Sequence, residues 1–92
     1  MAHTVQEKAK LLNRVGRLRG QVNALERALR DEQGCSEILQ LLAACRGAVN
    51  ALMAEVMEGH VKSHVLDPKR SPTAAQKKSA DEVVALIRRY LK

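Results

Sequence analysis

The sequence predicts an all-α protein whose subunit contains two long helices in an antiparallel hairpin and a short C-terminal helix. Apolar residues recur at alternating intervals of four and three over two long stretches, which is the heptad pattern of packed helices. A single short polar stretch separates them, and no segment alternates apolar and polar residues as a strand does. The 92 residues therefore form one helical domain, residues 1–92.

The first helix is predicted from about Thr4 or Val5 to Arg30. Thr4 and Glu7 have the spacing of a capping box, in which the two side chains accept hydrogen bonds from the first backbone amides. The apolar positions of this helix are Leu11, Val15, Leu18, Val22, Leu25 and Leu29.

The second helix is predicted from about Ser36 to Val65, because no helix-breaking residue precedes Pro68. Asp31 to Gly34 forms a turn short enough to make the two long helices antiparallel neighbours. The apolar positions of this helix are Ile38, Leu42, Cys45, Val49, Leu52 and Val56. Cys45 within this row is expected to be a small buried apolar residue.

A third, short helix is predicted from the helical spacing of Val83, Val84, Ile87 and Leu91. Two starting points remain open. Ser79 with Glu82 forms one candidate capping box, and Ser71-Pro72 or Thr73 could cap an earlier start. The polar stretch after Asp67-Pro68 is expected to be a linker.

Composition points to an oligomer in a reducing compartment. Aromatic residues make up 1% of the chain, so the large rings that anchor a small core are missing and association of subunits is an expected source of stability. Two cysteines without an apolar N-terminal segment favour the cytoplasm. The longest uncharged run, Ile38 to Cys45, is too short to cross a bilayer, so no membrane partner is expected.

The net charge of +6 is typical of a protein that binds phosphate polyanions. The first helix carries a basic stripe beside its apolar row, formed by Lys10, Arg14 and Arg17, with Arg19 on the other flank. The chain has a single aromatic residue, Tyr90, so it offers almost no ring for base stacking, and it has no helix-turn-helix or zinc-finger pattern. Double-stranded DNA is therefore the expected partner. Alternatively, these side chains only cover apolar edges and remain hydrated.

Three residues of the second helix are candidate metal ligands. His60 and His64 are four residues apart and therefore project from one helix face, where they can share a metal ion. Cys35 lies in the first turn, where the helix dipole favours an anionic sulfur ligand, but a continuous helix holds it about 37 Å from His60. Antiparallel pairing with a second subunit would bring Cys35 of one chain beside the histidines of the other.

The hairpin adds His3 to this candidate site, because the start of the first helix lies near the His60 end of the second. Removal of Met1 would also expose the α-amine of Ala2 there. Imidazole, thiolate and amine ligands suit Ni(II), Co(II) or Zn(II) better than Mg(II) or Ca(II). The alternative is that the histidines are ordinary surface residues and the tail is frayed.

Two stretches, Arg17-Leu18-Arg19-Gly20-Gln21 and the segment from Leu42 to Val56, closely resemble the CsoR/RcnR family of bacterial transcriptional repressors, as do the Cys35 and His60 positions. The resemblance covers essentially the whole chain. It implies a dimer built as an antiparallel four-helix bundle and a disc-shaped tetramer. It also implies binding to promoter DNA without effector and release when a metal ion or small electrophile occupies the site near Cys35.

Branches of that family differ at the site. Copper-sensing members have a second cysteine where this chain has His64, and formaldehyde-sensing members have proline where this chain has Ala2. The set His3, Cys35, His60 and His64 resembles the nickel- and cobalt-responsive branch, which implies de-repression of a metal efflux gene.

Two other functions remain open from the sequence. In a formaldehyde sensor of the same fold, Cys35 would attack the aldehyde and the amine of Ala2 would capture the adduct. In a helical scaffold, the heptads would bind protein partners without a role for DNA. An enzyme is not expected, because no set of nucleophile, base and oxyanion donors can be assembled.

Overall fold

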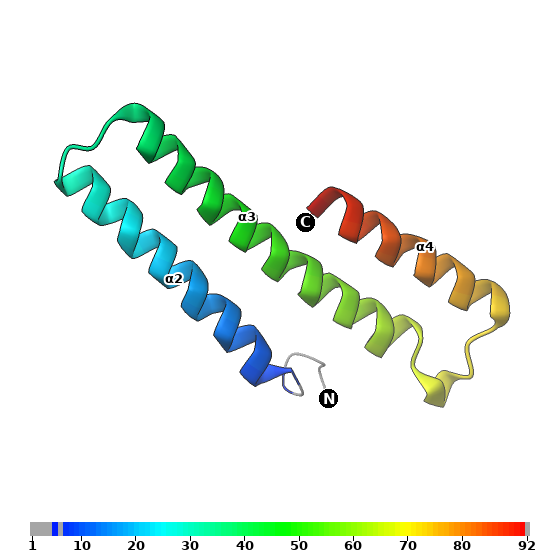
Figure 1. The fold of residues 1–92 in the computed structure, drawn as a ribbon. Helices are drawn as coiled ribbons and strands as arrows, with labels where there is room; N and C mark the ends of the chain where they lie inside the picture. Colours follow the sequence, from blue (N-terminus) through cyan, green and yellow to red (C-terminus); the bar gives the residue numbers. More distant parts are fainter. Residues whose placement is uncertain (1–4, 6, 92) are drawn as a thin grey trace.

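The computed structural model describes residue 5 and residues 7–91. In this part of the chain there are three α-helices and no strand, as Figure 1 shows, so the all-α prediction is confirmed. The helices are α2 (Lys8–Arg30), α3 (Cys35–His60) and α4 (Ala74–Leu91). A π-helical turn, η1 (Val61–Val65), continues α3, and a 3-10 turn, η2 (Pro68–Arg70), precedes α4.

Helix α2 begins at Lys8, later than the predicted start at Thr4 or Val5. The physical reason lies at Glu7, whose φ of −100° and ψ of 17° are outside the α-helical region, and whose side chain makes no capping hydrogen bond. The backbone amide of Leu11 donates to the carbonyl of Glu7 at 3.0 Å and closes the first turn. Thr4, the other half of the predicted capping box, lies outside the described residues.

The turn between α2 and α3 is a Schellman motif. The amide of Gln33 donates to the carbonyl of Ala28 at 3.0 Å, and that of Glu32 donates to Leu29 at 3.2 Å. Glu32 has a φ of 55°, the left-handed conformation that this motif requires. The motif reverses the chain at the turn predicted for Asp31 to Gly34, and Figure 1 shows α2 and α3 as an antiparallel hairpin.

The second long helix ends at Val65 as predicted, but its last five residues form a π-helical turn. There the amide of Leu66 donates to the carbonyl of Val61, five residues earlier, at 3.0 Å. The segment Cys35–Arg70 is long and apolar enough, by length and composition alone, to cross a membrane. The apolar helix of a helical bundle passes the same test.

Helix α4 begins at the earlier of the two predicted positions. The hydroxyl of Thr73 accepts from the amide of Gln76 at 3.1 Å, and the side chain of Gln76 accepts from the amide of Thr73 at 2.8 Å. This capping box overrides the one predicted at Ser79, which lies inside the helix. With 18 residues, α4 is the shortest of the three described helices, as predicted.

Helix α3 lies between the other two helices, with α4 folded back along its C-terminal half (Figure 1). The molecule is a thin plate with extents of 56 × 24 × 10 Å. Its radius of gyration is 17.3 Å, whereas a compact domain of this length has about 12 Å. A single layer of helices can bury only a small core, made of Ala28, Ala54, Ala80, Val84 and Ile87.

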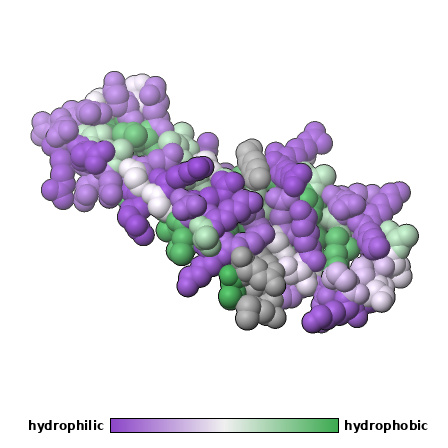
Figure 2. Space-filling view, turned by 60° about the horizontal axis from the view of Figure 1, so that its bottom comes forward, coloured by the Kyte–Doolittle hydropathy of each residue, from purple (hydrophilic) through white to green (hydrophobic). Residues whose placement is uncertain are grey.

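Much of the predicted apolar row faces solvent in the single chain. Val22 and Leu29 of α2 and Leu42 and Val49 of α3 are 40–58% exposed. Figure 2 shows apolar patches between hydrophilic residues on one face of the molecule. Cys45, which was expected to be buried, is half-buried in the single chain. A one-layer plate has no second layer to cover these positions, so their burial requires another chain.

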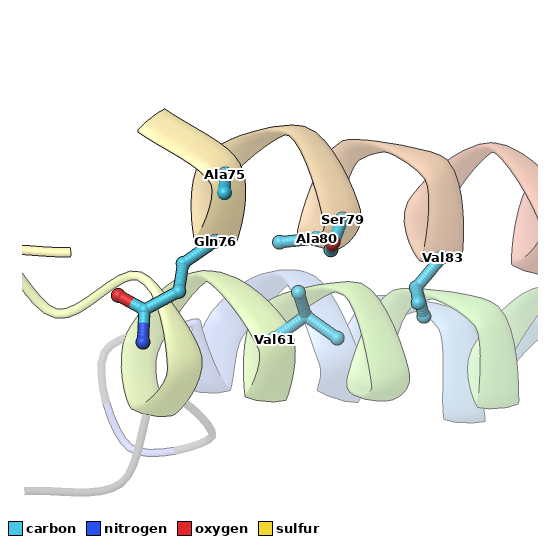
Figure 3. A pocket seen from close by; sticks show the side chains of 6 residues that line it. All are labelled: Val61, Ala75, Gln76, Ser79, Ala80 and Val83. Atoms are coloured by element: carbon cyan, nitrogen blue, oxygen red, sulfur yellow. The ribbon is translucent and has the colours of Figure 1, made fainter. Parts of the chain in front are cut away.

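Helix α4 packs against the end of α3 through small side chains. Figure 3 shows Ala80 and Val83 of α4 facing Val61 of η1, with Gln76 reaching toward the end of that turn. These residues line an open apolar groove of about 370 Å³. Because of this contact, α2, α3 and α4 lie side by side at the His60 end of α3.

Candidate effector site and nucleic-acid interface

The two histidines lie side by side where α3 passes into the π-helical turn. His60 is the last residue of α3, and the centroid of its ring is 4.7 Å from that of His64, with the ring planes tilted by 40°. Both residues are exposed. The expectation that they project from one face is confirmed.

Cys35 lies at the opposite end of the same helix, as its exposed first residue. The 25 residues between Cys35 and His60 correspond to about 37 Å of helix. Accordingly, no group of three or more potential ligands gathers within the described part of one chain. His3 and Ala2, the other two predicted contributors, lie outside the described residues.

Of the predicted DNA contacts, Arg17 and Arg19 are exposed on α2, the most basic helix. Lys10 and Arg14 differ, because both form ion pairs with Glu55 of α3. The ammonium nitrogen of Lys10 is 3.0 Å from Oε1 of Glu55, and Arg14 contacts Oε2 through its Nε atom. Two of the four predicted phosphate contacts are therefore engaged inside the subunit.

Glu55 is a buried carboxylate, 9% exposed. Burial raises the pKa of Glu55, but hydrogen bonds and charge attraction from Arg14 and Lys10 more than offset this, so its pKa lies below the ordinary value of 4.5. The carboxylate is therefore ionised at neutral pH.

A second buried carboxylate, Glu58, lies one turn further along α3. Arg88 of α4 binds its Oε1 through two nitrogens, with Nη2 at 2.6 Å and Nε at 2.8 Å. Glu55 and Glu58 thus link α3 to α2 on one side and to α4 on the other. Both links lie within two turns of His60.

Neither carboxylate was predicted from the sequence, although a signal for Glu55 was present. In an antiparallel hairpin, residues equally distant from the turn lie level with each other. Lys10 is 21 residues before Asp31 and Glu55 is 21 residues after Gly34, so the two are level. A charged residue beside the apolar row of α3, level with a cation of α2, predicts an ion pair.

Residues 7–89 match the family model described as metal-sensitive transcriptional repressor. The chain belongs to this family. The match includes α2, α3 and all but the last two residues of α4, and it contains Cys35, His60 and His64.

The chain is similar over its full length to two curated proteins. One, from Serratia marcescens, is described as an uncharacterized protein in the bioA 5' region and is 45% identical over 92 residues, which is 100% of both chains. The other is the transcriptional repressor RcnR of Salmonella paratyphi B, 38% identical over 92 residues and again 100% of both chains.

A solved structure has the same fold. It is a glutamate-to-histidine variant of the formaldehyde-responsive regulator FrmR from Salmonella enterica serovar Typhimurium, with a TM-score of 0.65 and 44% identity. The match covers 92% of this chain and 94% of that one.

Family membership makes the chain a transcriptional repressor of the RcnR/FrmR type and not an enzyme. A repressor of this family binds DNA, oligomerises and responds to a metal ion. This favours a DNA-binding regulator over the helical scaffold considered from the sequence. Oligomerisation also accounts for the apolar surface of α3 that a single chain leaves exposed.

Proposed function

We propose that this protein is a cytoplasmic repressor that binds promoter DNA without metal and releases it on binding Ni(II) or Co(II), de-repressing a metal efflux gene. The observation that carries the proposal is the adjacency of His60 and His64, whose ring centroids are 4.7 Å apart. The pair lies at the opposite end of α3 from Cys35. The imidazoles of His60 and His64 and the thiolate of Cys35 form a donor set of intermediate softness, which suits Ni(II), Co(II) and also Zn(II).

The site forms between two subunits of a dimer. A two-fold axis that pairs two α3 helices antiparallel, as in a four-helix bundle, places Cys35 of each chain near the histidine pair of its partner. His3 joins from the N-terminal arm, with the α-amine of Ala2 as a further donor. The exposed positions of α3, such as Leu42 and Val49, then pack in the interface, and two dimers form a tetramer.

DNA binding uses the basic α2 helices of the assembly through Lys10, Arg14, Arg17 and Arg19. These side chains contact phosphates and respond to the shape of the duplex. Metal binding ties the end of α3 and the N-terminal arm to the neighbouring subunit, which changes how the α2 helices are spaced. A coupling of about 1–3 kcal/mol is enough to lower DNA affinity several-fold to more than a hundredfold.

A gel-shift titration of promoter DNA by the reduced protein, with and without Ni(II), tests the proposal. We expect binding to be weaker by about fivefold or more with the metal, together with thiolate-to-metal absorption on titration of the protein alone. His64→Leu is expected to weaken both responses and leave binding of the metal-free protein intact. Unchanged DNA affinity on addition of each metal would overturn the proposal.

A formaldehyde-responsive repressor is the second candidate, favoured by the 44% identity to FrmR. The Cys35 thiolate would add to the aldehyde carbon, and the amine of Ala2 would then displace water to give a methylene bridge. Mass spectrometry distinguishes the two candidates. A gain of one carbon atom that links the N-terminal peptide to the Cys35 peptide, with loss of DNA binding, supports the aldehyde.

A further inference from the structure

We propose that Glu55 is an internal competitor of DNA phosphate that holds Lys10 and Arg14 inside the subunit and so sets the DNA affinity of the repressor. The inference rests on the proposed function, in that these two cations face DNA when they are released. It gives Glu55 a positioning role that neither the family description nor the relatives' names assign.

The first support is the geometry of the pair. Both oxygens of Glu55 are used, one by Lys10 at 3.0 Å and the other by Arg14. Arg14 is 28% exposed, whereas Lys10 is 65% exposed and lies at the rim of the same contact. The carboxylate therefore pairs with two cations on one face of α2, which would otherwise be available to an external anion.

The second support is the charge balance at this end of the bundle. Helix α2 contains seven cationic side chains and Glu26 as its one carboxylate, so its own charges leave the cations in excess. Glu55 is supplied by α3 and neutralises one of the two cations that it contacts. Since its pKa is held below the ordinary value, the competing negative charge persists across the physiological pH range.

The third support is that both cations can leave. Each is a long side chain that is partly exposed, Lys10 at 65% and Arg14 at 28%, so each can reach solvent by a change of rotamer. Exchanging a protein carboxylate for a DNA phosphate keeps one anion beside each cation but leaves Glu55 buried without its partners. The free-energy cost of leaving this buried carboxylate unpaired opposes DNA binding, and substitution of Glu55 by a neutral residue removes that cost.

The test is a salt titration with a fluorescein-labelled duplex of random sequence, about 30 base pairs long, since the phosphate contribution does not depend on base sequence. Glu55→Gln is expected to bind more tightly at low salt than the unmodified protein. For each protein, the affinity at about 50 mM salt is divided by the affinity at about 200 mM salt. This ratio should be larger for Glu55→Gln than for the unmodified protein, by about 3.5-fold for each additional phosphate that the variant neutralises. Fluorescence anisotropy measures the affinities, without added metal.

Glu82→Gln is the matched control, because it removes one negative charge from an exposed position of α4 that forms no ion pair with the described residues. We expect the control to change the salt dependence far less. In a Lys10→Gln/Arg14→Gln background, Glu55→Gln should add nothing, since the cations it would release are absent. Circular dichroism and sedimentation check that each variant keeps its fold and assembly.

Unchanged or weaker DNA binding by folded Glu55→Gln would overturn the inference. If Glu55→Gln does not fold, Glu55→Asp retains the charge but shortens the reach to both cations. A salt dependence of Glu55→Asp steeper than that of the unmodified protein supports the inference, and an unchanged or shallower one overturns it. If the unmodified protein itself does not bind the duplex, the proposed function fails instead.

Discussion

The two halves of the α2–α3 hairpin differ in how many helices they contain and in how their charges are paired. The half near His60 is three helices wide, and it contains two buried carboxylates, Glu55 and Glu58, each paired with a cation of a neighbouring helix. The half near the turn is two helices wide. There Leu29, Leu39 and Leu42 are 46–59% exposed.

Each half lacks something that the other supplies. The His60 half is held within one chain by ion pairs, and under the proposed function it still needs a sulfur ligand. The ligand proposed for it, Cys35, lies in the other half, at the start of α3. An antiparallel partner would meet both needs at once, because it lays the Cys35 half of one chain against the His60 half of the other.

Leu42→Glu should break this complementarity most strongly. The substitution places a charge in the apolar row of α3, which a partner helix is expected to cover. The free energy of association should become less favourable by about 3 kcal/mol, which corresponds to roughly a hundredfold weaker association. Sedimentation equilibrium measures the effect. Gln40→Glu adds the same charge at an exposed polar position and should leave association unchanged. Equal self-association of both variants would contradict the role of this row.

Arg88→Ala tests the link between α3 and α4 in the His60 half. The buried carboxylate of Glu58 loses a two-nitrogen contact, so the free energy of unfolding should fall by about 1–2 kcal/mol after allowance for the 58% exposure of the Arg88 side chain. Urea unfolding measures this. Arg89→Ala is the control, because that guanidinium only lies over the Tyr90 ring at 5.6 Å, and its loss should cost about 0.5 kcal/mol or less. Equal losses would remove any special role for Arg88.

Acid should weaken the same half. Since the pKa of Glu55 is lowered from 4.5 in the folded chain, its contribution to stability is fully present above that value and is lost as the pH falls through the lowered pKa. The free energy of unfolding should therefore decline below about pH 4.5. Glu55→Gln should be less stable at neutral pH and show a flatter decline. Parallel pH profiles for the two proteins would contradict this assignment.

Glu32→Gly should stabilise the turn at the other end. Glu32 adopts a φ of 55°, which glycine reaches without a steric penalty, so a gain of about 0.5–1 kcal/mol is expected. Thermal or urea unfolding measures it. Gln33→Gly, one residue later, should bring no gain, because φ is not positive there. A stabilisation of equal size at both positions would point to a general effect of flexibility.

The helix boundaries show where sequence patterns were sufficient and where they were not. The heptad rows and the Asp31 to Gly34 turn were predicted from residues close in sequence, whose interactions are local. Two starts competed for α4, a capping box at Ser79 and an earlier cap at Ser71-Pro72 or Thr73, and sequence alone did not rank them. The structure selects Thr73, and the resulting helix presents Ala80 to the core, where it is 3% exposed.

The candidate site divides in a similar way. The adjacency of His60 and His64 could be predicted because helical spacing sets it. The engagement of Lys10 and Arg14 by Glu55 was missed, since the basic stripe was considered on α2 alone. A comparison of residues level across the hairpin would have identified the pair.

By itself, the sequence determined the three helices of residues 7–91, the hairpin formed by the first two and the separation of Cys35 from His60. Each of these follows from backbone geometry repeated along one helix or from a short turn. Only the tertiary structure decided which cations of α2 are engaged, how far α4 extends along α3 and which apolar residues one chain leaves exposed. Those outcomes depend on the rotation and register of one helix against another, which contacts distant in sequence determine.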